Sequence, residues 1–140
     1  MLEKNIPENL FIHQFVGINK LQRRVDRHLS IHGISLNEYI ILRKLSFAIN
    51  KTLRRTELAE VIGVTASGVT RLLAPMEKTG LIEKRANPKD ARVSLVVLSS
   101  GGETLFENAT ITFRHVVTEL TNDLSDRQLE NLEQLLSKIV

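Results

Sequence analysis

The 140-residue sequence contains no cysteine and no tryptophan, and aromatic residues make up only 4% of it. The lack of cysteine excludes disulfide bonds, thiolate metal ligands, cysteine nucleophiles and thiol-based redox sensing. No apolar run approaches the ~20 residues that a membrane-spanning helix needs. The first ten residues, MLEKNIPENL, lack the apolar segment of a signal peptide. We therefore expect a cytoplasmic protein that does not interact with a membrane.

Motifs of enzyme chemistry are also missing. Gly101 and Gly102 fall at the predicted start of a helix, whereas a phosphate-binding loop would follow a strand of a βαβ unit. No nucleophile and base occur together in a recognisable context. We expect a protein that is not an enzyme and that needs no cofactor.

Charge is present but unevenly distributed. The net charge is +3, and residues 51–92 contain nine Lys and Arg against five Asp and Glu, while residues 93–140 contain three against seven. A basic middle segment predicts an anionic partner such as nucleic acid. Charge alone does not separate this interpretation from a solvated surface with a chance asymmetry.

Helix signals occur along most of the chain. Apolar residues at steps of three and four predict a long helix from about Glu8 to His32, ended by Gly33. Three capping-box patterns predict further helix starts: Ser35–Glu38, Ser100–Glu103 and Ser125–Gln128. The second helix is expected to continue to about Ile49.

The middle of the chain has a different pattern. Two short helices are predicted around Gly63: 57–62 with Thr56 as N-cap, and 66–79 with Thr65 as N-cap. Residues 52–54 are expected to be a short extended link, and residues 81–86 and 92–98 to be the strands of a hairpin. The predicted fold is mostly α with one small β-hairpin.

The spacing around Gly63 satisfies the requirements of a helix-turn-helix. Ala59 is small, Gly63 lies at the turn, and Val69 and Leu72 are branched apolar residues that face the core. On the second helix, one face is apolar and the opposite face is small, hydroxylic or basic without an acid. The outward-facing residues are Ser67, Thr70, Arg71, Ala74 and Lys78.

This outward face predicts a helix that lies in the major groove of double-stranded DNA. Arg can pair bidentately with guanine, while Ser and Thr can contact phosphates or base edges. A winged helix that binds proteins instead would expose an apolar or acidic face, and this alternative stays open beside the first.

The hairpin tip, ANPKDARVSL (86–95), is richer in charge than a turn requires. Lys89 and Arg92 supply positive charge for the DNA backbone or minor groove. Asp90 is close enough to orient the Arg92 guanidinium through a salt bridge, and Pro88 stiffens the turn. We interpret the hairpin as the wing of a winged helix-turn-helix.

Residues 58–105 resemble the winged helix-turn-helix of MarR-type transcriptional regulators. The resemblance is carried by VTRLL, MEKTGLIEKR, the wing pattern Asp90-Ala-Arg92, and LSSGGE, which is similar to the family's leucine-threonine-x-x-glycine. It implies a homodimer that binds a palindromic operator, with Ser67, Thr70 and Arg71 in the major groove and Arg92 in the minor groove. Further candidate contacts to DNA are Thr65, Lys78 and Lys89, and, by charge alone, Arg54 and Arg55.

The domain organisation follows from the same considerations. We expect one domain over residues 1–140, with the DNA-binding part at about 52–98 and dimerisation helices at about 8–34 and 100–140. The terminal helices are amphipathic, and the small central part cannot cover all their apolar faces, so a partner subunit is expected to do so. An intramolecular bundle is the alternative.

Pro75 departs from the expected pattern because it lies inside the predicted recognition helix. It has no amide hydrogen, so the carbonyl of Arg71 loses its helical partner, and the ring favours a kink. The kink would fall beyond the DNA-contacting residues.

The resemblance also implies a repressor that a small anionic or aromatic ligand releases from DNA. Candidate ligand contacts, chosen only by expected position, are Arg24, His28 and Tyr39. His28 and His32 are four residues apart, a spacing that can bind a metal ion, so a metal-responsive regulator of the same fold is an alternative. Without cysteine or a clear acidic third ligand, we expect no metal site.

Overall fold

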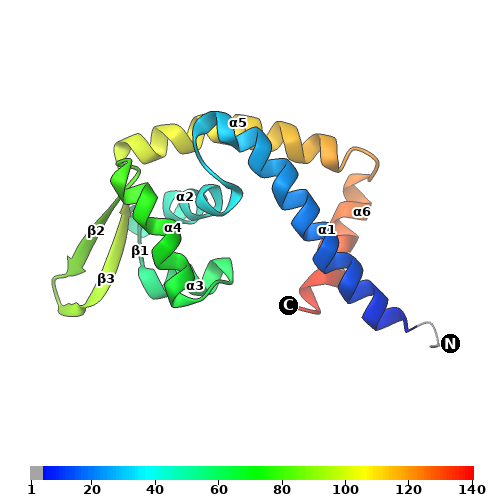
Figure 1. Ribbon diagram of the computed structural model, residues 1–140, viewed down its shortest axis with the longest axis horizontal. Helices are drawn as coiled ribbons and strands as arrows, with labels where there is room; N and C mark the ends of the chain where they lie inside the picture. Colours follow the sequence, from blue (N-terminus) through cyan, green and yellow to red (C-terminus); the bar gives the residue numbers. More distant parts are fainter. Residues whose placement is uncertain (1–4) are drawn as a thin grey trace.

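The computed structural model describes residues 5–140 and has the mostly α fold that the sequence predicts (Figure 1). Its helices are α1 (Ile6–Leu29), α2 (Leu36–Phe47), α3 (Arg55–Ile62), α4 (Ala66–Lys78), α5 (Ser100–Leu120) and α6 (Asp126–Ser137). Its strands are β1 (Thr52–Arg54), β2 (Ile82–Asn87) and β3 (Asp90–Leu98). Two 3₁₀ turns, η1 (Ser30–His32) and η2 (Ile49–Lys51), flank α2.

The molecule has two parts that α5 connects (Figure 1). One part contains α3, α4 and the sheet, and the other contains most of α1 together with α6. Helix α2 lies below α5 and contacts α3, α4 and β3. No helix among the described residues is both long and apolar enough to span a membrane.

The sheet has three antiparallel strands in the order β1-β3-β2. Thr52 lies opposite Val97 and Ile82 opposite Leu98, with an irregularity in register between Ala86 and Asn87. The segment predicted as an extended link is therefore a strand. Three residues are too few to show strand periodicity, and only pairing with β3 stabilises the segment as one.

The hydrophobic core lies between α2, α4, α5 and the sheet. Tyr39, Leu42 and Leu45 of α2 have no exposed surface, and neither do Val69, Leu73 and Met76 of α4. Apolar residues at steps of three and four on both helices bury one face each, as the sequence predicts. In α1, by contrast, the only buried residues are Val25 and Leu29 near its C-terminal end.

Two predicted helix starts are wrong. Helix α3 begins at Arg55, not after Thr56, because β1 leads directly into it and the Glu57 carboxylate accepts a hydrogen bond from the Arg54 amide at 3.3 Å. Helix α5 is capped by Ser99, whose Oγ accepts a hydrogen bond from the Gly102 amide at 2.9 Å. Residues 99 and 100 are both serine, so the choice depends on the contacts of the helix end, which the sequence pattern does not contain.

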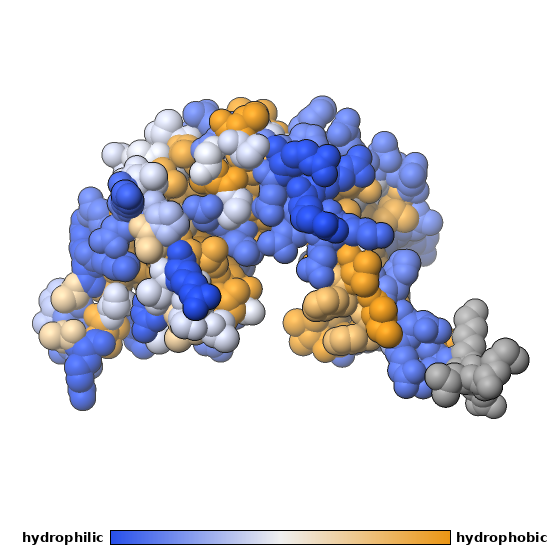
Figure 2. Space-filling view, in the orientation of Figure 1, coloured by the Kyte–Doolittle hydropathy of each residue, from blue (hydrophilic) through white to orange (hydrophobic). Residues whose placement is uncertain are grey.

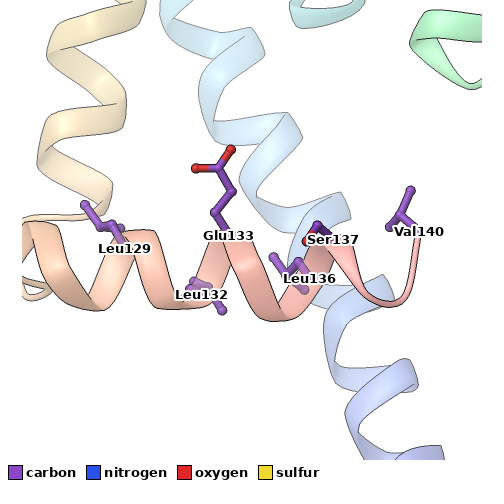
Figure 3. Close-up of a pocket in the computed structure, with 6 residues that line it drawn as sticks. All are labelled: Leu129, Leu132, Glu133, Leu136, Ser137 and Val140. Atoms are coloured by element: carbon purple, nitrogen blue, oxygen red, sulfur yellow. The ribbon is translucent and has the colours of Figure 1, made fainter.

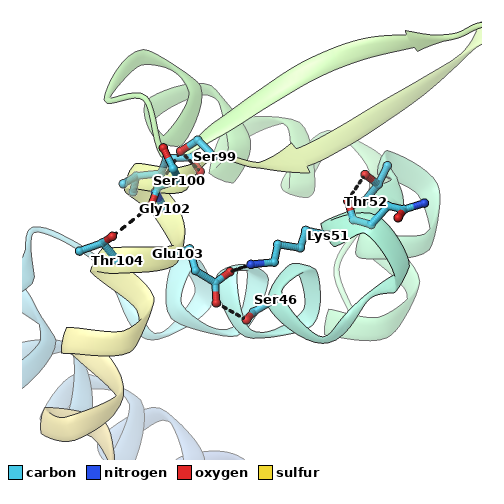
Figure 4. Close-up of polar contacts among 10 residues, drawn as sticks. Ser46, Lys51, Thr52, Ser99, Ser100, Gly102, Glu103 and Thr104 are labelled. Atoms are coloured by element: carbon cyan, nitrogen blue, oxygen red, sulfur yellow. Dashed lines mark hydrogen bonds and ion pairs between the residues drawn. The ribbon is translucent and has the colours of Figure 1, made fainter.

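The junction between the wing and α5 is closely packed (Figure 4). The Ser99 hydroxyl lies 2.9 Å from the Leu81 carbonyl oxygen, to which it can donate. Glu103, predicted to cap its own helix, instead accepts hydrogen bonds from Lys51 Nζ at 2.8 Å and Ser46 Oγ at 3.0 Å. These contacts join the end of α2 and the turn η2 to the first turn of α5.

Candidate nucleic-acid interface

The turn between α3 and α4 has the geometry of a helix-turn-helix. Gly63 ends α3 with φ of 74°, in the left-handed region that glycine adopts without a steric penalty. The Val64 amide donates to the Ala59 carbonyl at 3.0 Å, and Ala59 is only 7% exposed. A small residue at position 59 lets the two helices approach closely, so the predicted motif is present.

Helix α4 presents the predicted outward face to solvent. Thr65 is its N-cap, and Thr65 Oγ1 accepts a hydrogen bond from the Gly68 amide at 3.0 Å. The helix continues through Pro75 to Lys78. All five predicted residues are exposed: Ser67, Thr70, Arg71, Ala74 and Lys78. The helix also exposes one acid, Glu77, near its C-terminal end.

Arg55 connects α3 to this recognition helix. Its Nη1 donates to the Ala66 carbonyl at 3.1 Å and to Thr70 Oγ1 at 3.0 Å. Thr70 Oγ1 in turn donates to the Ala66 carbonyl at 3.0 Å. Arg55, chosen from the sequence only for its charge, thus fixes the orientation of a candidate base-contacting side chain, a role that no sequence pattern indicated.

The wing carries its basic residues at an exposed tip. Pro88 and Lys89 connect β2 to β3, and the Lys89 amide donates to Asn87 Oδ1 at 2.9 Å. Asp90 accepts hydrogen bonds from both the amide and Nε of Arg92, at 3.0 and 3.2 Å. The predicted Asp90–Arg92 salt bridge is therefore present.

This salt bridge orients the Arg92 guanidinium without covering it, since the Arg92 side chain is 91% exposed. The Arg92 side-chain and backbone donors lower the pKa of Asp90 below its ordinary value, so the carboxylate stays ionised. An oriented and exposed guanidinium is suited to contact phosphates or a narrow minor groove.

Other basic residues of this surface are paired with acids. Arg54 lies 3.4 Å from Glu57 (Nε to Oε1), and Lys84 lies 3.2 Å from Glu77 (Nζ to Oε2). Lys84 and Arg85 also line a shallow depression on the hairpin together with Arg92. Lys84 and Arg85 were not among the predicted DNA contacts, although their place in a strand next to the basic wing tip could have indicated them.

The candidate ligand residues are not brought together around one site. Arg24 and His28 are exposed on α1, where His28 Nδ1 lies 2.9 Å from the Arg24 carbonyl oxygen. Tyr39 has no exposed surface and packs between the rings of Phe106 and Phe113, at centroid distances of 5.5 and 4.5 Å. In the single chain Tyr39 is therefore a core residue, and its contact with a ligand stays a prediction.

His28 and His32, the pair with metal-binding spacing, have separate environments. His32 Nε2 lies 2.7 Å from Thr112 Oγ1, while Nδ1 of His28 faces its own helix. Within residues 5–140, no three His, Cys, Asp or Glu side chains form a group that could hold a metal ion.

A helix-turn-helix with a basic outward face, followed by a hairpin that carries an exposed arginine, is the winged-helix arrangement of DNA-binding transcriptional regulators. The MarR family model matches residues 34–94. The multiple antibiotic resistance protein MarR of Salmonella typhimurium is 30% identical over 122 residues, which cover 86% of this chain and 83% of that protein. The chain belongs to the MarR family.

Relatives of known structure agree with this assignment over nearly the whole chain. A mutant of MarR from E. coli complexed with operator DNA has a TM-score of 0.82 at 29% identity, and the match covers 96% of this chain and 94% of that one. The Streptomyces coelicolor regulator Sco3205, in complex with DNA, shares the fold with a TM-score of 0.88 at 23% identity, covering 99% and 89% of the two chains. MarR of E. coli K12 is 29% identical over 137 residues, or 96% of this chain and 92% of that protein.

Proposed function

We propose that the protein is a homodimeric repressor that binds a palindromic DNA operator and is released from it by a small anionic or aromatic ligand. The observation that carries the proposal is an unpartnered apolar arm beside a winged helix whose recognition face is exposed and basic. The similarity in fold to an E. coli MarR mutant crystallised with operator DNA supports DNA as the partner.

The apolar arm consists of α1 and α6. On α1, Phe11 and Phe15 are 71% and 65% exposed, and Ile18 is 57% exposed. No residue of α6 is buried, although leucines recur along this helix at helical spacing. Apolar side chains gather on this arm in the space-filling view (Figure 2).

An open, shallow apolar depression lies along α6 and the residues that follow it (Figure 3). Its apolar lining residues are Leu129, Leu132, Leu136 and Val140. Contiguous apolar patches of this kind are rare on monomers and mark interfaces. A second copy of the chain is the occupant that we propose, because a twofold interface would cover α1 and α6 of both subunits with the same patch.

The dimer gives the DNA site its symmetry. Two recognition helices related by a twofold axis contact two half-sites about one helical turn apart, so the operator is expected to be a palindrome. Within each subunit we assign base contacts to Ser67, Thr70 and Arg71, minor-groove contact to Arg92, and backbone contacts to the flanking group. That group comprises Arg54, Arg55, Thr65, Lys78 and Lys89.

Ligand release is the part of the proposal that concerns regulation. A ligand bound between the arm and the winged-helix part would change the spacing of the two recognition helices. Arg24 and His28, exposed on α1, are the candidate contacts for an anionic group. A panel of small aromatic carboxylates, added to the operator complex and followed by fluorescence anisotropy, tests this step.

The decisive experiment combines DNA selection with a matched pair of variants. Selection from a randomised duplex library is expected to enrich a palindrome. Ile18→Glu on the arm and Ile49→Glu at η2 replace isoleucines that are 57% and 88% exposed. We expect Ile18→Glu to give monomers in analytical ultracentrifugation and to bind the palindrome at least tenfold more weakly. Ile49→Glu should remain dimeric. A monomeric wild-type protein, or equal behaviour of the two variants, would contradict the proposal.

A further inference from the structure

Thr70 lies on the exposed face of α4, yet its hydroxyl group is already engaged within the protein. The single hydroxyl hydrogen is donated to the Ala66 carbonyl at 3.0 Å. One oxygen lone pair accepts from Arg55 Nη1 at 3.0 Å. Thr70 therefore has no hydrogen left to donate to the acceptors that bases show in the major groove.

This arrangement changes which part of the side chain can face DNA. The hydroxyl is turned back onto the preceding turn of its own helix, so the γ-methyl is the side-chain group of this exposed residue that stays available to a partner. Its neighbours on the same face, Ser67 and Ala74, are small, and Ser67 Oγ lies 3.2 Å from Thr65 Oγ1. A small apolar spot thus lies between the polar and basic groups of the recognition face.

Among the groups on base edges in the major groove, only the C5-methyl of thymine is apolar. We propose that Thr70 is a specificity-determining residue that contacts the methyl group of a thymine through its own methyl group. We also assign Arg55 as the positioning residue that fixes this orientation, because the same Nη1 atom donates to Thr70 Oγ1 and to the Ala66 carbonyl. The inference rests on the proposed placement of α4 in the major groove.

The test removes methyl groups one at a time from both partners. In the operator selected by the wild-type protein, each thymine of a half-site is replaced by uracil, which lacks only the C5-methyl. We expect one such replacement to weaken wild-type binding about three- to fivefold per half-site, the size expected for burial of one methyl group. Uracil at thymines outside the half-sites is the control and should have no effect.

Two variants of Thr70 separate the methyl group from the hydroxyl. Thr70→Val keeps the methyl and should retain both the affinity and the penalty for uracil. Thr70→Ser keeps the hydroxyl, should bind about three- to fivefold more weakly, and should no longer distinguish thymine from uracil. If Thr70→Val loses affinity while Thr70→Ser retains it, the hydroxyl makes the contact and the inference is wrong.

The role of Arg55 is tested through discrimination rather than affinity, because loss of a basic residue weakens DNA binding in any case. Arg55→Ala should reduce the ratio of thymine to uracil affinity towards one. Thr70→Val in the Arg55→Ala background should restore that ratio, since valine needs no hydrogen bond to orient its methyl groups. An unchanged ratio in Arg55→Ala would remove the positioning role.

The outcomes also separate this inference from the proposed function. If the wild-type protein selects no DNA site, both the function and the inference are overturned. If it selects a palindrome in which no thymine is required, or in which no uracil substitution weakens binding, only the inference is overturned.

Discussion

Gly102 is the residue at which one added methyl group should have the largest effect on the fold. It lies in the first turn of α5, against the turn that leads into the wing (Figure 4). A Cβ atom at this position would lie 2.1 Å from the Leu81 carbonyl oxygen and 2.7 Å from Leu98 Cδ1. We therefore expect Gly102→Ala to push α5 away from the base of the wing.

The cost follows from how firmly the neighbours are held. The Leu81 oxygen accepts a hydrogen bond from the Ser99 amide at 3.1 Å, and Leu98 lies in the central strand of the sheet opposite Ile82. Relief of the clash needs a backbone shift of about 1 Å, because ordinary contact begins at 3.4 Å. Such overpacking costs about 1–3 kcal/mol, and contact with backbone favours the upper part of that range.

Gly101 provides a matched control one residue earlier. A Cβ there would meet its nearest atoms, the Gly80 carbonyl oxygen and Ser99 Oγ, at 3.8 Å, which is ordinary contact. Gly101→Ala should therefore stabilise the protein by about 0.5–1 kcal/mol, the difference in helix propensity between alanine and glycine.

The measurement is urea unfolding of the three proteins, followed by circular dichroism at one fixed protomer concentration, because unfolding of a dimer depends on concentration. The midpoint of Gly102→Ala should lie below that of the wild type, and the midpoint of Gly101→Ala above it. Equal midpoints for the two variants would refute the reasoning, since both substitutions add the same methyl group to the same helix.

Three further predictions concern the DNA interface and the wing junction. Arg71→Ala should weaken specific binding by about 1–3 kcal/mol and relax base preference at one position per half-site; binding to operators with single base substitutions measures this, and an unchanged preference would assign Arg71 to packing. Arg92→Ala should lower the slope of log affinity against log salt by about one per subunit, as anisotropy over a salt series would show; an unaltered slope would mean that the wing does not touch DNA. Lys51 and Ser46 lower the pKa of Glu103, with Lys51 as the main cause, so the carboxylate stabilises the fold above its unfolded pKa and this stabilisation is lost as pH falls through the folded value. Because the Lys51 side chain is 48% exposed and solvent screens the pair, Glu103→Gln should destabilise the protein by only about 0.2–1 kcal/mol at pH 7. The difference from the wild type should vanish at a pH low enough to protonate Glu103, and a difference independent of pH would contradict the assignment.

Local patterns were sufficient to predict much of the fold. The apolar spacing of the helices, the cap at Ser35 and the left-handed turn at Gly63 all depend on residues within a few positions of one another. The same holds for the Asp90–Arg92 salt bridge, whose partners are two residues apart. The candidate recognition face could also be predicted, because helical periodicity alone separates it from the buried face.

Interactions between distant segments were not predictable in this way. Residues 52–54 form a strand only because β3 lies beside them, and Ser99 caps α5 where Ser100 matches the local pattern equally well. Tyr39 was chosen as a candidate ligand contact only by its expected position, and its actual surroundings come from α5, some 70 residues away.

The sequence by itself therefore determined the class of protein: a helix-turn-helix, a basic wing and amphipathic terminal helices, each specified by short-range spacing. The tertiary structure alone decided how these parts meet. It placed Arg55 against Thr70, Lys51 against Glu103 and Gly102 against the Leu81 carbonyl. Side-chain orientation at such contacts depends on hydrogen-bond partners and close packing between segments far apart in the chain, which no local pattern contains.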